Sequence, residues 1–185
     1  MAAYVSGDEN AYARLVERHL KSVYTFALRF TEDMGEAEDI AQESFLKAWK
    51  HMRRFDSRKS RFKTWLMRIV RNTAIDHARK RKNIPFSMLA NENESDFGST
   101  IPDDAPLLDE VAARKDDARS LEAALQKLTL AHREILLLYN GNDFTFEEIA
   151  AILGTSLNTV KSRYHRALQA IRNTLVHQNE WEPRT

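Results

Sequence analysis

Hydrophobic residues recur every three or four positions along most of the chain, which is the period of an amphipathic helix. A first helix is predicted from Tyr12 to Phe30, preceded by a capping box of Ser6 and Glu9. A second is predicted over residues 35–52, where acidic residues suit a helix N-terminus. Its predicted core positions are Ile40, Ala41, Phe45, Ala48, Trp49 and Met52.

A third helix is predicted to begin within the stretch RFKTWLMRIVRN, residues 61–72, and to run to about Lys82. Its apolar residues fall on one stripe, so most of them are expected in the core rather than stacked on bases. Phe62 and Ile69 are expected to be structural, whereas Trp65 lies at a basic rim and can also present an edge to a base. The stripe is completed by Leu66, Val70 and Thr73.

The C-terminal part of the chain is predicted to be helical as well. Five glycines and four prolines are few for a turn-rich β architecture, and no strand pattern competes with the helical one. The predicted fold is all-α, with two small helical domains joined by a long acidic linker. The four predicted C-terminal helices span residues 118–128, 131–139, 145–154 and 156–176.

Charge is segregated along the chain, although the formal net charge of its 185 residues is only +1. Residues 47–82 are rich in Lys and Arg, and their acids are Asp56 and Asp76. Residues 83–113 contain acids but no Lys or Arg, and residues 155–176 are basic with no acid. We expect an N-terminal domain (1–83), an acidic linker (84–117), a helix-turn-helix domain (118–178) and a C-terminal tail (179–185).

Several classes of protein are disfavoured by the composition. The chain has no cysteine, which excludes disulfides and thiolate–zinc sites. Its first residues lack the features of a signal peptide, and no apolar run approaches the ~18 residues of a membrane span. Its histidines are scattered without ligand spacing. We therefore expect a cytoplasmic protein without membrane insertion, cofactor, metal or catalytic residues.

Residues 145–165 form the strongest local motif, a helix-turn-helix. Thr145 and Glu148 make a second capping box. Gly154 can adopt the positive φ that ends the first helix, Ser156 can cap the next, and Val160 packs that helix back onto the first. Leu153, Leu157 and Tyr164 complete the small core.

The outer face of the second helix of this motif carries donors suited to phosphates and to major-groove base edges. An ordinary helical hairpin with a solvated basic face is the alternative, but the spacing, the two caps and the absence of acids favour DNA reading. These predicted DNA-binding residues are Asn158, Thr159, Lys161, Ser162, Arg163, His165 and Arg166.

A second cationic surface is predicted on the third helix and the loop of residues 56–61 before it. These residues suit phosphates, and Arg79, Lys80, Arg81 and Lys82 extend the face. The residues predicted to hold DNA here are Arg58, Lys59, Arg61, Lys63, Trp65, Arg68, Arg71 and Asn72.

Asp39, Gln42 and Glu43 are spaced to share one exposed face of the second helix. Periodicity alone favours a solvated face with no function.

Together these motifs resemble the bacterial sigma-70 family, specifically its small two-domain extracytoplasmic-function (ECF) group. AEDIAQESFLKAW resembles the family's region 2.2, FKTWLMRIVRNTAIDHARK resembles regions 2.3 and 2.4, and FEEIAAILGTSLNTVKSRYHRAL resembles region 4.2. The match covers nearly the whole chain, with the three motifs in the family's order. The resemblance implies a promoter-specificity subunit of RNA polymerase rather than an enzyme.

The resemblance also implies partners for each surface. Asp39, Gln42 and Glu43 match positions that dock on the clamp coiled coil of the polymerase's largest subunit, and the C-terminal domain would meet the flap region. The helix-turn-helix would read the −35 promoter element. Asn72 and its basic neighbours would engage the −10 element, and the loop of residues 56–61 would accept a flipped base. The linker would thread near the active site and the RNA exit channel.

One position departs from the family's primary members, which carry two adjacent tryptophans where the duplex is wedged open. Here Trp65 is followed by Leu66. A weaker wedge is expected to demand a better-matched promoter. Many family members are held by an anti-sigma factor, which is a further candidate partner, although the sequence identifies none.

Three alternatives remain open at this point. A conventional activator or repressor would use the helix-turn-helix without joining polymerase, and would leave Asp39, Gln42 and Glu43 unexplained. A nucleic-acid enzyme would need a carboxylate or His–metal constellation, which the sequence does not offer. A sigma-like protein acting mainly as a sequestered partner is the third.

Overall fold

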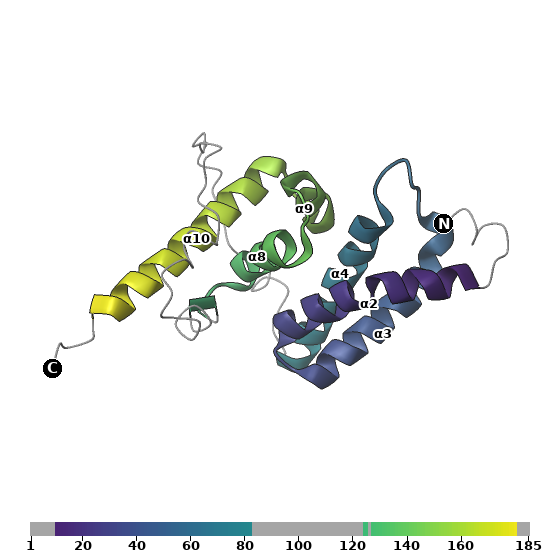
Figure 1. The fold of residues 1–185 in the computed structure, drawn as a ribbon, viewed down its shortest axis with the longest axis horizontal. Helices are drawn as coiled ribbons and strands as arrows, with labels where there is room; N and C mark the ends of the chain where they lie inside the picture. Colours follow the sequence, from purple (N-terminus) through teal and green to yellow (C-terminus); the bar gives the residue numbers. More distant parts are fainter. Residues whose placement is uncertain (1–9, 83–123, 126, 181–185) are drawn as a thin grey trace. The chain divides into compact units, whose positions relative to one another are not determined.

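The structure is a computed structural model that describes residues 10–82, 124–125 and 127–180 of the 185-residue chain. The chain divides into two compact units, the first holding residues 10–82 and the second most of residues 124–180. The predicted Ser6–Glu9 capping box, the acidic linker, and residues 118–123 and 126 of the predicted helix over residues 118–128 lie outside the described residues. Throughout the described ranges the regular elements are helices, which confirms the all-α prediction (Figure 1).

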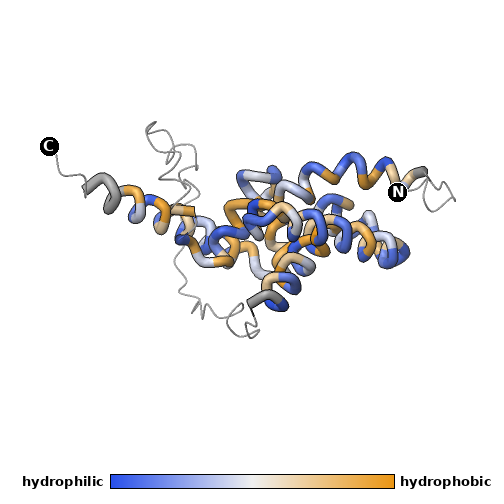
Figure 2. The backbone as a smooth tube through the Cα atoms, turned by 90° about the horizontal axis from the view of Figure 1, so that it is seen from below, coloured by the Kyte–Doolittle hydropathy of each residue, from blue (hydrophilic) through white to orange (hydrophobic). Residues whose placement is uncertain are grey.

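The N-terminal module, residues 10–82, is a three-helix bundle. It consists of α2 (Asn10–Thr31), α3 (Met34–His51) and α4 (Phe62–Lys82), with a short 3-10 helix η1 (Met52–Arg54) after α3. Helices α2 and α3 pack on each other, and α4 packs on both. Hydrophobic and polar positions alternate around the helices instead of forming blocks, as Figure 2 shows. The fully buried side chains include Val23, Phe26, Ile40, Leu66, Met67 and Val70.

A tight turn joins α2 to α3. Glu32 adopts a left-handed conformation with φ 60°, and the Asp33 carboxylate accepts a 2.9 Å hydrogen bond from the Glu36 backbone N–H. Asp33 is therefore the N-cap of α3, a role typical of Asp that the sequence reading did not assign.

The C-terminal module, residues 130–180, consists of α8 (Leu130–Asn142), α9 (Phe146–Leu153) and α10 (Leu157–Glu180). Helix α8 packs on α10. The rings of Tyr139, Phe146 and Tyr164, one from each helix, meet with centroid separations of 4.6, 4.8 and 5.2 Å. The fully buried aliphatic side chains are Ile135, Leu138, Ile149, Ile152, Val160 and Ile171.

Most predicted helix positions are confirmed, and one prediction about packing needs correction. Trp49, predicted in the core of α3, is 43% exposed. Phe62 and Ile69, expected to be structural, are half-buried, and Phe62 packs against Phe55 and Trp65. Leu66, Val70 and Thr73 are buried as predicted. Among the helices of the described ranges, none is long and apolar enough to cross a membrane.

Candidate nucleic-acid interface and docking groove

The helix-turn-helix forms through the local interactions that its sequence predicts. The Thr145 hydroxyl accepts a bond from the Glu148 N–H at 3.3 Å, and the Glu148 carboxylate accepts one from the Thr145 N–H at 3.1 Å. This reciprocal pair is the predicted capping box. Gly154 follows α9 with φ +68°, a left-handed conformation that a residue with a Cβ adopts only at a cost.

The second helix of the motif, α10, is capped and anchored as predicted. The Ser156 hydroxyl accepts a 3.1 Å bond from the Thr159 N–H, and Val160 and Tyr164 are buried. Leu153 and Leu157, which were assigned to the same small core, are half-buried.

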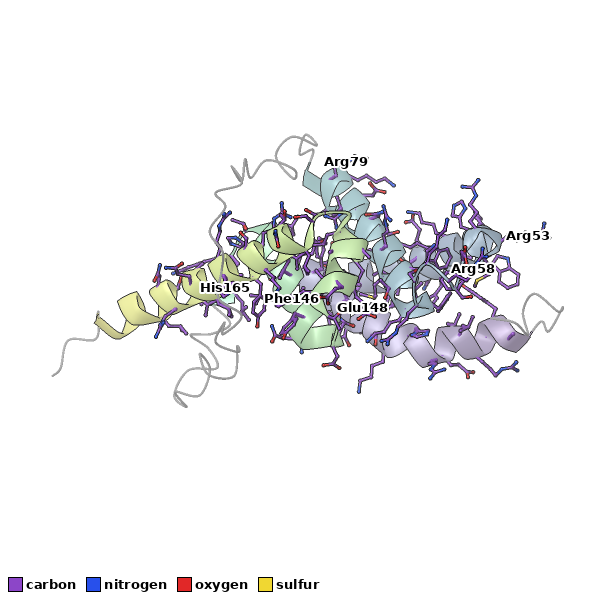
Figure 3. The ribbon with its side chains drawn as sticks, turned by 90° about the horizontal axis from the view of Figure 1, so that it is seen from above. Arg53, Arg58, Arg79, Phe146, Glu148 and His165 are labelled. Carbon is purple, nitrogen blue, oxygen red and sulfur yellow. The ribbon has the colours of Figure 1, made fainter. Side chains whose placement is uncertain are left out.

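The predicted DNA-binding residues of α10 lie outside this core. Asn158 is exposed, whereas the others are partly exposed. His165 lies on α10, and Phe146 and Glu148 lie on α9 (Figure 3). Burial, and secondarily the charge of Lys161, lower the pKa of His165 below its usual 6.5, so at neutral pH it offers one N–H donor and one acceptor. The partly exposed residues are Thr159, Lys161, Ser162, Arg163, His165 and Arg166.

On α4, the predicted strand-binding residues differ in exposure. Arg68 and Asn72 are exposed, and Lys63 and Arg71 are half-buried. Trp65 is half-buried between Phe55 and Phe62, with ring centroids 5.3 and 5.7 Å away, so part of its indole remains accessible. Arg79 lies toward the other end of α4 from the loop that carries Arg58 (Figure 3).

The loop before α4 is organised around Asp56. Its carboxylate accepts three hydrogen bonds from Arg58, one from the backbone N–H and two from the guanidinium, at 2.9–3.0 Å. The side-chain bonds, followed by the backbone bond, hold the pKa of Asp56 below its usual value. Arg58 is thus held by Asp56, while Lys59 and Arg61 of the same loop are exposed.

The predicted docking face on α3 is split. Asp39 and Gln42 are exposed, but Glu43 turns toward α4, where its carboxylate lies 2.7 Å from His77 Nε2 and 2.9 Å from Lys47 Nζ. Asp39 and Gln42 are fully on the exposed face, whereas the Glu43 side chain is 39% exposed and shares that face only in part. The docking role of the three residues stays a prediction. A helical wheel gives the angle of a residue but not the neighbour that occupies that angle.

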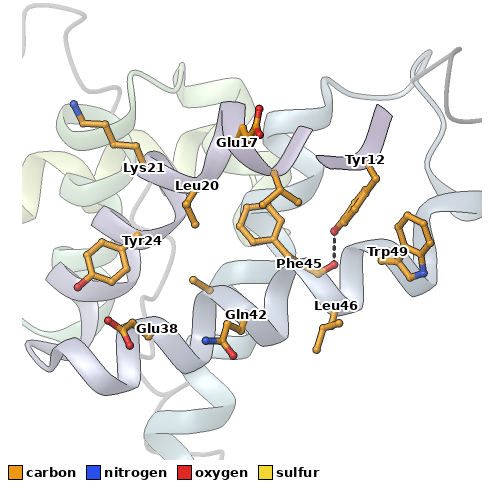
Figure 4. Close-up of a pocket in the computed structure, with 12 residues that line it drawn as sticks. Tyr12, Glu17, Leu20, Lys21, Tyr24, Glu38, Gln42, Phe45, Leu46 and Trp49 are labelled. Atoms are coloured by element: carbon orange, nitrogen blue, oxygen red, sulfur yellow. Dashed lines mark hydrogen bonds between the residues drawn. The ribbon is translucent and has the colours of Figure 1, made fainter. Parts of the chain in front are cut away.

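Gln42 instead lies at an apolar groove between α2 and α3, with a volume of about 930 Å³ (Figure 4). Tyr12 and Trp49 contact each other edge-to-face, and the Tyr12 hydroxyl donates to the Phe45 carbonyl. Leu20 and Leu46 are 47% and 59% exposed, so the groove presents apolar surface to solvent. Its lining comprises Tyr12, Val16, Leu20, Tyr24, Ala41, Phe45, Leu46 and Trp49, with Glu17, Lys21, Glu38 and Gln42 as polar members.

The groove was not predicted from the sequence. The available signal was Leu46, a large apolar residue that falls outside the apolar stripe of its helix and is therefore expected on the surface. In the part of the chain that the structure describes, no cluster of three or more His, Cys, Asp or Glu side chains could hold a metal ion.

The fold and its surfaces indicate the class of protein. Two helical units, a helix-turn-helix and a second basic helix are expected of a DNA-binding transcription protein. Sequence comparison defines the family. The family model Sigma-70 region 2 matches residues 15–84, and the model Sigma-70, region 4 matches residues 118–171.

Curated relatives agree with both matches. The ECF RNA polymerase sigma factor SigW of Bacillus subtilis is 31% identical over 171 residues, which cover 91% of each chain. The ECF RNA polymerase sigma factor SigE of Mycolicibacterium smegmatis is 30% identical over 179 residues, covering 95% of this chain and 67% of the relative. The chain therefore belongs to the sigma-70 family, as an ECF-type sigma subunit of RNA polymerase.

Solved structures of similar proteins have the same fold. The sigma factor RpoE from Bartonella quintana, solved in complex with the anti-sigma factor NepR, is 28% identical with a TM-score of 0.65, covering 90% of this chain and 98% of that one. CnrH, solved with the cytosolic domain of CnrY, is 25% identical with a TM-score of 0.65, covering 95% and 94%. Sigma factors are promoter-specificity subunits rather than enzymes. A conventional helix-turn-helix regulator is not favoured, because region 2 matches as well as region 4.

Proposed function

We propose that the two modules divide the work of a sigma subunit. The N-terminal domain (1–83) docks on core RNA polymerase and holds the −10 strand, the C-terminal domain (118–178) reads the −35 element, and the linker (84–117) spans between them. The pairing of two unlike surfaces on one chain carries this proposal. One is an apolar groove beside Asp39 and Gln42, and the other is the acid-free donor face of α10.

The −35 surface is the outer face of α10, from Asn158 to Arg166. Three cations, Lys161, Arg163 and Arg166, suit phosphates and guanine edges, whereas the polar side chains and neutral His165 suit base edges in the major groove. The Ser156 cap and the buried Val160 support this role, because they fix the start of the helix that must enter the groove.

The −10 surface combines exposed Arg68 and Asn72 with the loop that Asp56 organises. The residues of α4 bind along the melted strand and hold it in position, and its bases are bound after they have unstacked. Leu66 is 1% exposed, so the position after Trp65 contributes to the core and cannot act as a second wedge. This supports the expectation that the chain demands a well-matched −10 element.

The docking surface consists of Asp39, Gln42 and the groove. A coiled-coil helix with an apolar edge and basic flanks fits it, since the groove is lined by two acids, Glu17 and Glu38, and one cation, Lys21. Asp39, which follows Glu38 on α3, adds an exposed carboxylate. The clamp coiled coil of the polymerase's largest subunit is the proposed occupant, with the flap region meeting the C-terminal domain. An anti-sigma factor is proposed as a regulatory partner, because the structural neighbour RpoE was solved in complex with the anti-sigma factor NepR. The site of action would be the cytoplasm, where bacterial polymerase works.

The docking proposal is tested by Leu46→Asp, measured as equilibrium binding to core polymerase. A buried carboxylate in the groove should weaken binding by about tenfold or more. Met34→Asp is the matched control, because Met34 is 70% exposed on the same helix outside the groove, and it should bind like wild type. Wild-type affinity of Leu46→Asp, or an equal loss in the control, would overturn the docking assignment.

A further inference from the structure

A cluster of four polar side chains joins α3 to α4. Glu43 of α3 accepts bonds through both carboxylate oxygens: Oε2 lies 2.7 Å from Nε2 of His77 on α4, and Oε1 lies 2.9 Å from Nζ of Lys47. Lys47 also donates to the hydroxyl of buried Thr73 on α4, at 3.1 Å. Two hydrogen bonds therefore cross between the helices, and the Glu43–Lys47 pair connects them along α3.

This cluster is partly shielded from water. The side chains of His77, Lys47 and Glu43 are 22%, 34% and 39% exposed. Shielded pairs are screened less by salt than pairs at an open surface. The bonds from Lys47 and then His77 lower the pKa of Glu43 to about 2, so the carboxylate stays ionised at any physiological pH.

The cluster links two surfaces that the proposed function uses. Asp39 and Gln42 project from exposed positions of α3, while Glu43, one residue further along, faces α4. Helix α4 in turn carries exposed Arg68 and Asn72, and Asn72 directly precedes Thr73. A shift of α4 against α3 would move these strand-binding residues relative to the docked polymerase.

We propose that Glu43, Lys47, Thr73 and His77 form a polar brace that fixes α4 against the polymerase-docking helix α3. Glu43 is then a positioning residue for strand capture. The proposal rests on the proposed function of α3 and α4. The brace ensures that Arg68 and Asn72 meet the melted strand in a fixed register when the holoenzyme opens a promoter.

The test separates docking from opening by measuring both in reconstituted holoenzyme. Equilibrium binding to core polymerase reports docking. The fluorescence of a 2-aminopurine placed in the −10 element reports opening, on a duplex promoter and on the same promoter with that element already unpaired. The promoter is one selected by wild-type holoenzyme from random sequence. The variants are Glu43→Gln, His77→Ala and the double, with His51→Ala as the matched control at an exposed histidine of α3.

The brace predicts similar defects in promoter opening whether Glu43 on α3 or His77 on α4 is substituted. Glu43→Gln and His77→Ala should each lower the opening equilibrium about fivefold, the scale of a partly shielded charged hydrogen bond. The double variant should lower the opening equilibrium no further than either single variant, because both substitutions remove the same Glu43–His77 hydrogen bond. The affinity of His77→Ala for core polymerase should stay within about twofold of wild type. On the promoter whose −10 element is already unpaired, each variant should give the 2-aminopurine signal of wild type, and His51→Ala should behave as wild type in every assay.

Other results would overturn the brace. An opening defect in Glu43→Gln that His77→Ala does not share would remove the Glu43–His77 bond from the mechanism. Additive defects in the double variant, or an equal defect in His51→Ala, would remove the coupling. Lys47→Met is a second variant, which leaves the Glu43–His77 bond in place and should reduce opening by about twofold. Circular dichroism at the assay temperature verifies that each variant is folded. If wild-type protein itself fails to bind core polymerase, the proposed function fails whatever the brace variants do.

Discussion

The two modules differ in how they are held together. In the C-terminal module the helix-turn-helix is set by local signals: a capping box, a left-handed glycine and a serine cap, all within a dozen residues. Its core still joins Tyr139, Phe146 and Tyr164 from three helices. The N-terminal module depends on contacts between distant residues, such as Tyr12 with Trp49 and Glu43 with His77. Local signals set the turn and the start of α10, whereas contacts between distant residues form the groove and hold α3 against α4.

The largest expected effect tests whether the modules are independent. Phe26 is fully buried among α2, α3 and α4, so Phe26→Ala should destabilise the N-terminal module by about 3–5 kcal/mol. Thermal unfolding followed by amide NMR of the full chain would show loss of N-terminal resonances while those around Tyr164 persist. Simultaneous loss of both sets would show that the modules fold as one unit.

The next largest effect is expected at the turn of the helix-turn-helix. Gly154→Val places a β-branched residue at φ +68° and should cost about 1–2 kcal/mol of C-terminal stability. Promoter binding by holoenzyme should weaken at the −35 element, with binding to core polymerase unchanged. A variant as stable as wild type would contradict the conformational role of this glycine.

A smaller effect is expected at the capping box. Thr145→Ala removes the hydroxyl that accepts the Glu148 N–H and should cost about 1 kcal/mol. Thr155→Ala is the matched control, a nearby threonine whose side chain caps neither helix of the motif. Urea unfolding monitored by near-UV circular dichroism of the tyrosines would measure the free energy of unfolding of both variants. An equal loss in the two would contradict the capping role of Thr145.

The smallest effect is a pH dependence in the N-terminal module. The folded-state pKa of Glu43, about 2, lies below its usual 4.5, so the ionised carboxylate adds stability above pH 4.5 that is lost as pH falls toward 2. Because Glu43 is partly exposed, we expect at most about 1 kcal/mol. Glu43→Gln should flatten the acid limb of the stability curve, measured by urea unfolding at several pH values. An unchanged acid limb would contradict the pairing.

The contrast between modules also explains what could be predicted from the sequence. Thr145, Gly154 and Ser156 were assigned correctly, because each acts on a backbone group within a few residues. Trp49 was assigned to the core because its helical angle fits the stripe, yet it is 43% exposed and lines the groove against Tyr12 of α2. The partners of Glu43 and the shape of the groove depend on where α4 and α2 lie against α3, which periodicity does not give. Leu46, outside the apolar stripe of α3, was the one signal of the groove. The roles of the individual DNA-facing residues stay predictions.

The central claim is that this chain directs core polymerase to promoters through both of its surfaces. In vitro transcription with core polymerase and a selected promoter tests it directly, comparing wild type with Asp39→Ala and Arg166→Ala. The account predicts initiation only when wild-type protein is added, with each variant reducing it about tenfold, through core binding for Asp39→Ala and promoter binding for Arg166→Ala. Undiminished promoter-dependent initiation by both variants would contradict the assignment of these surfaces.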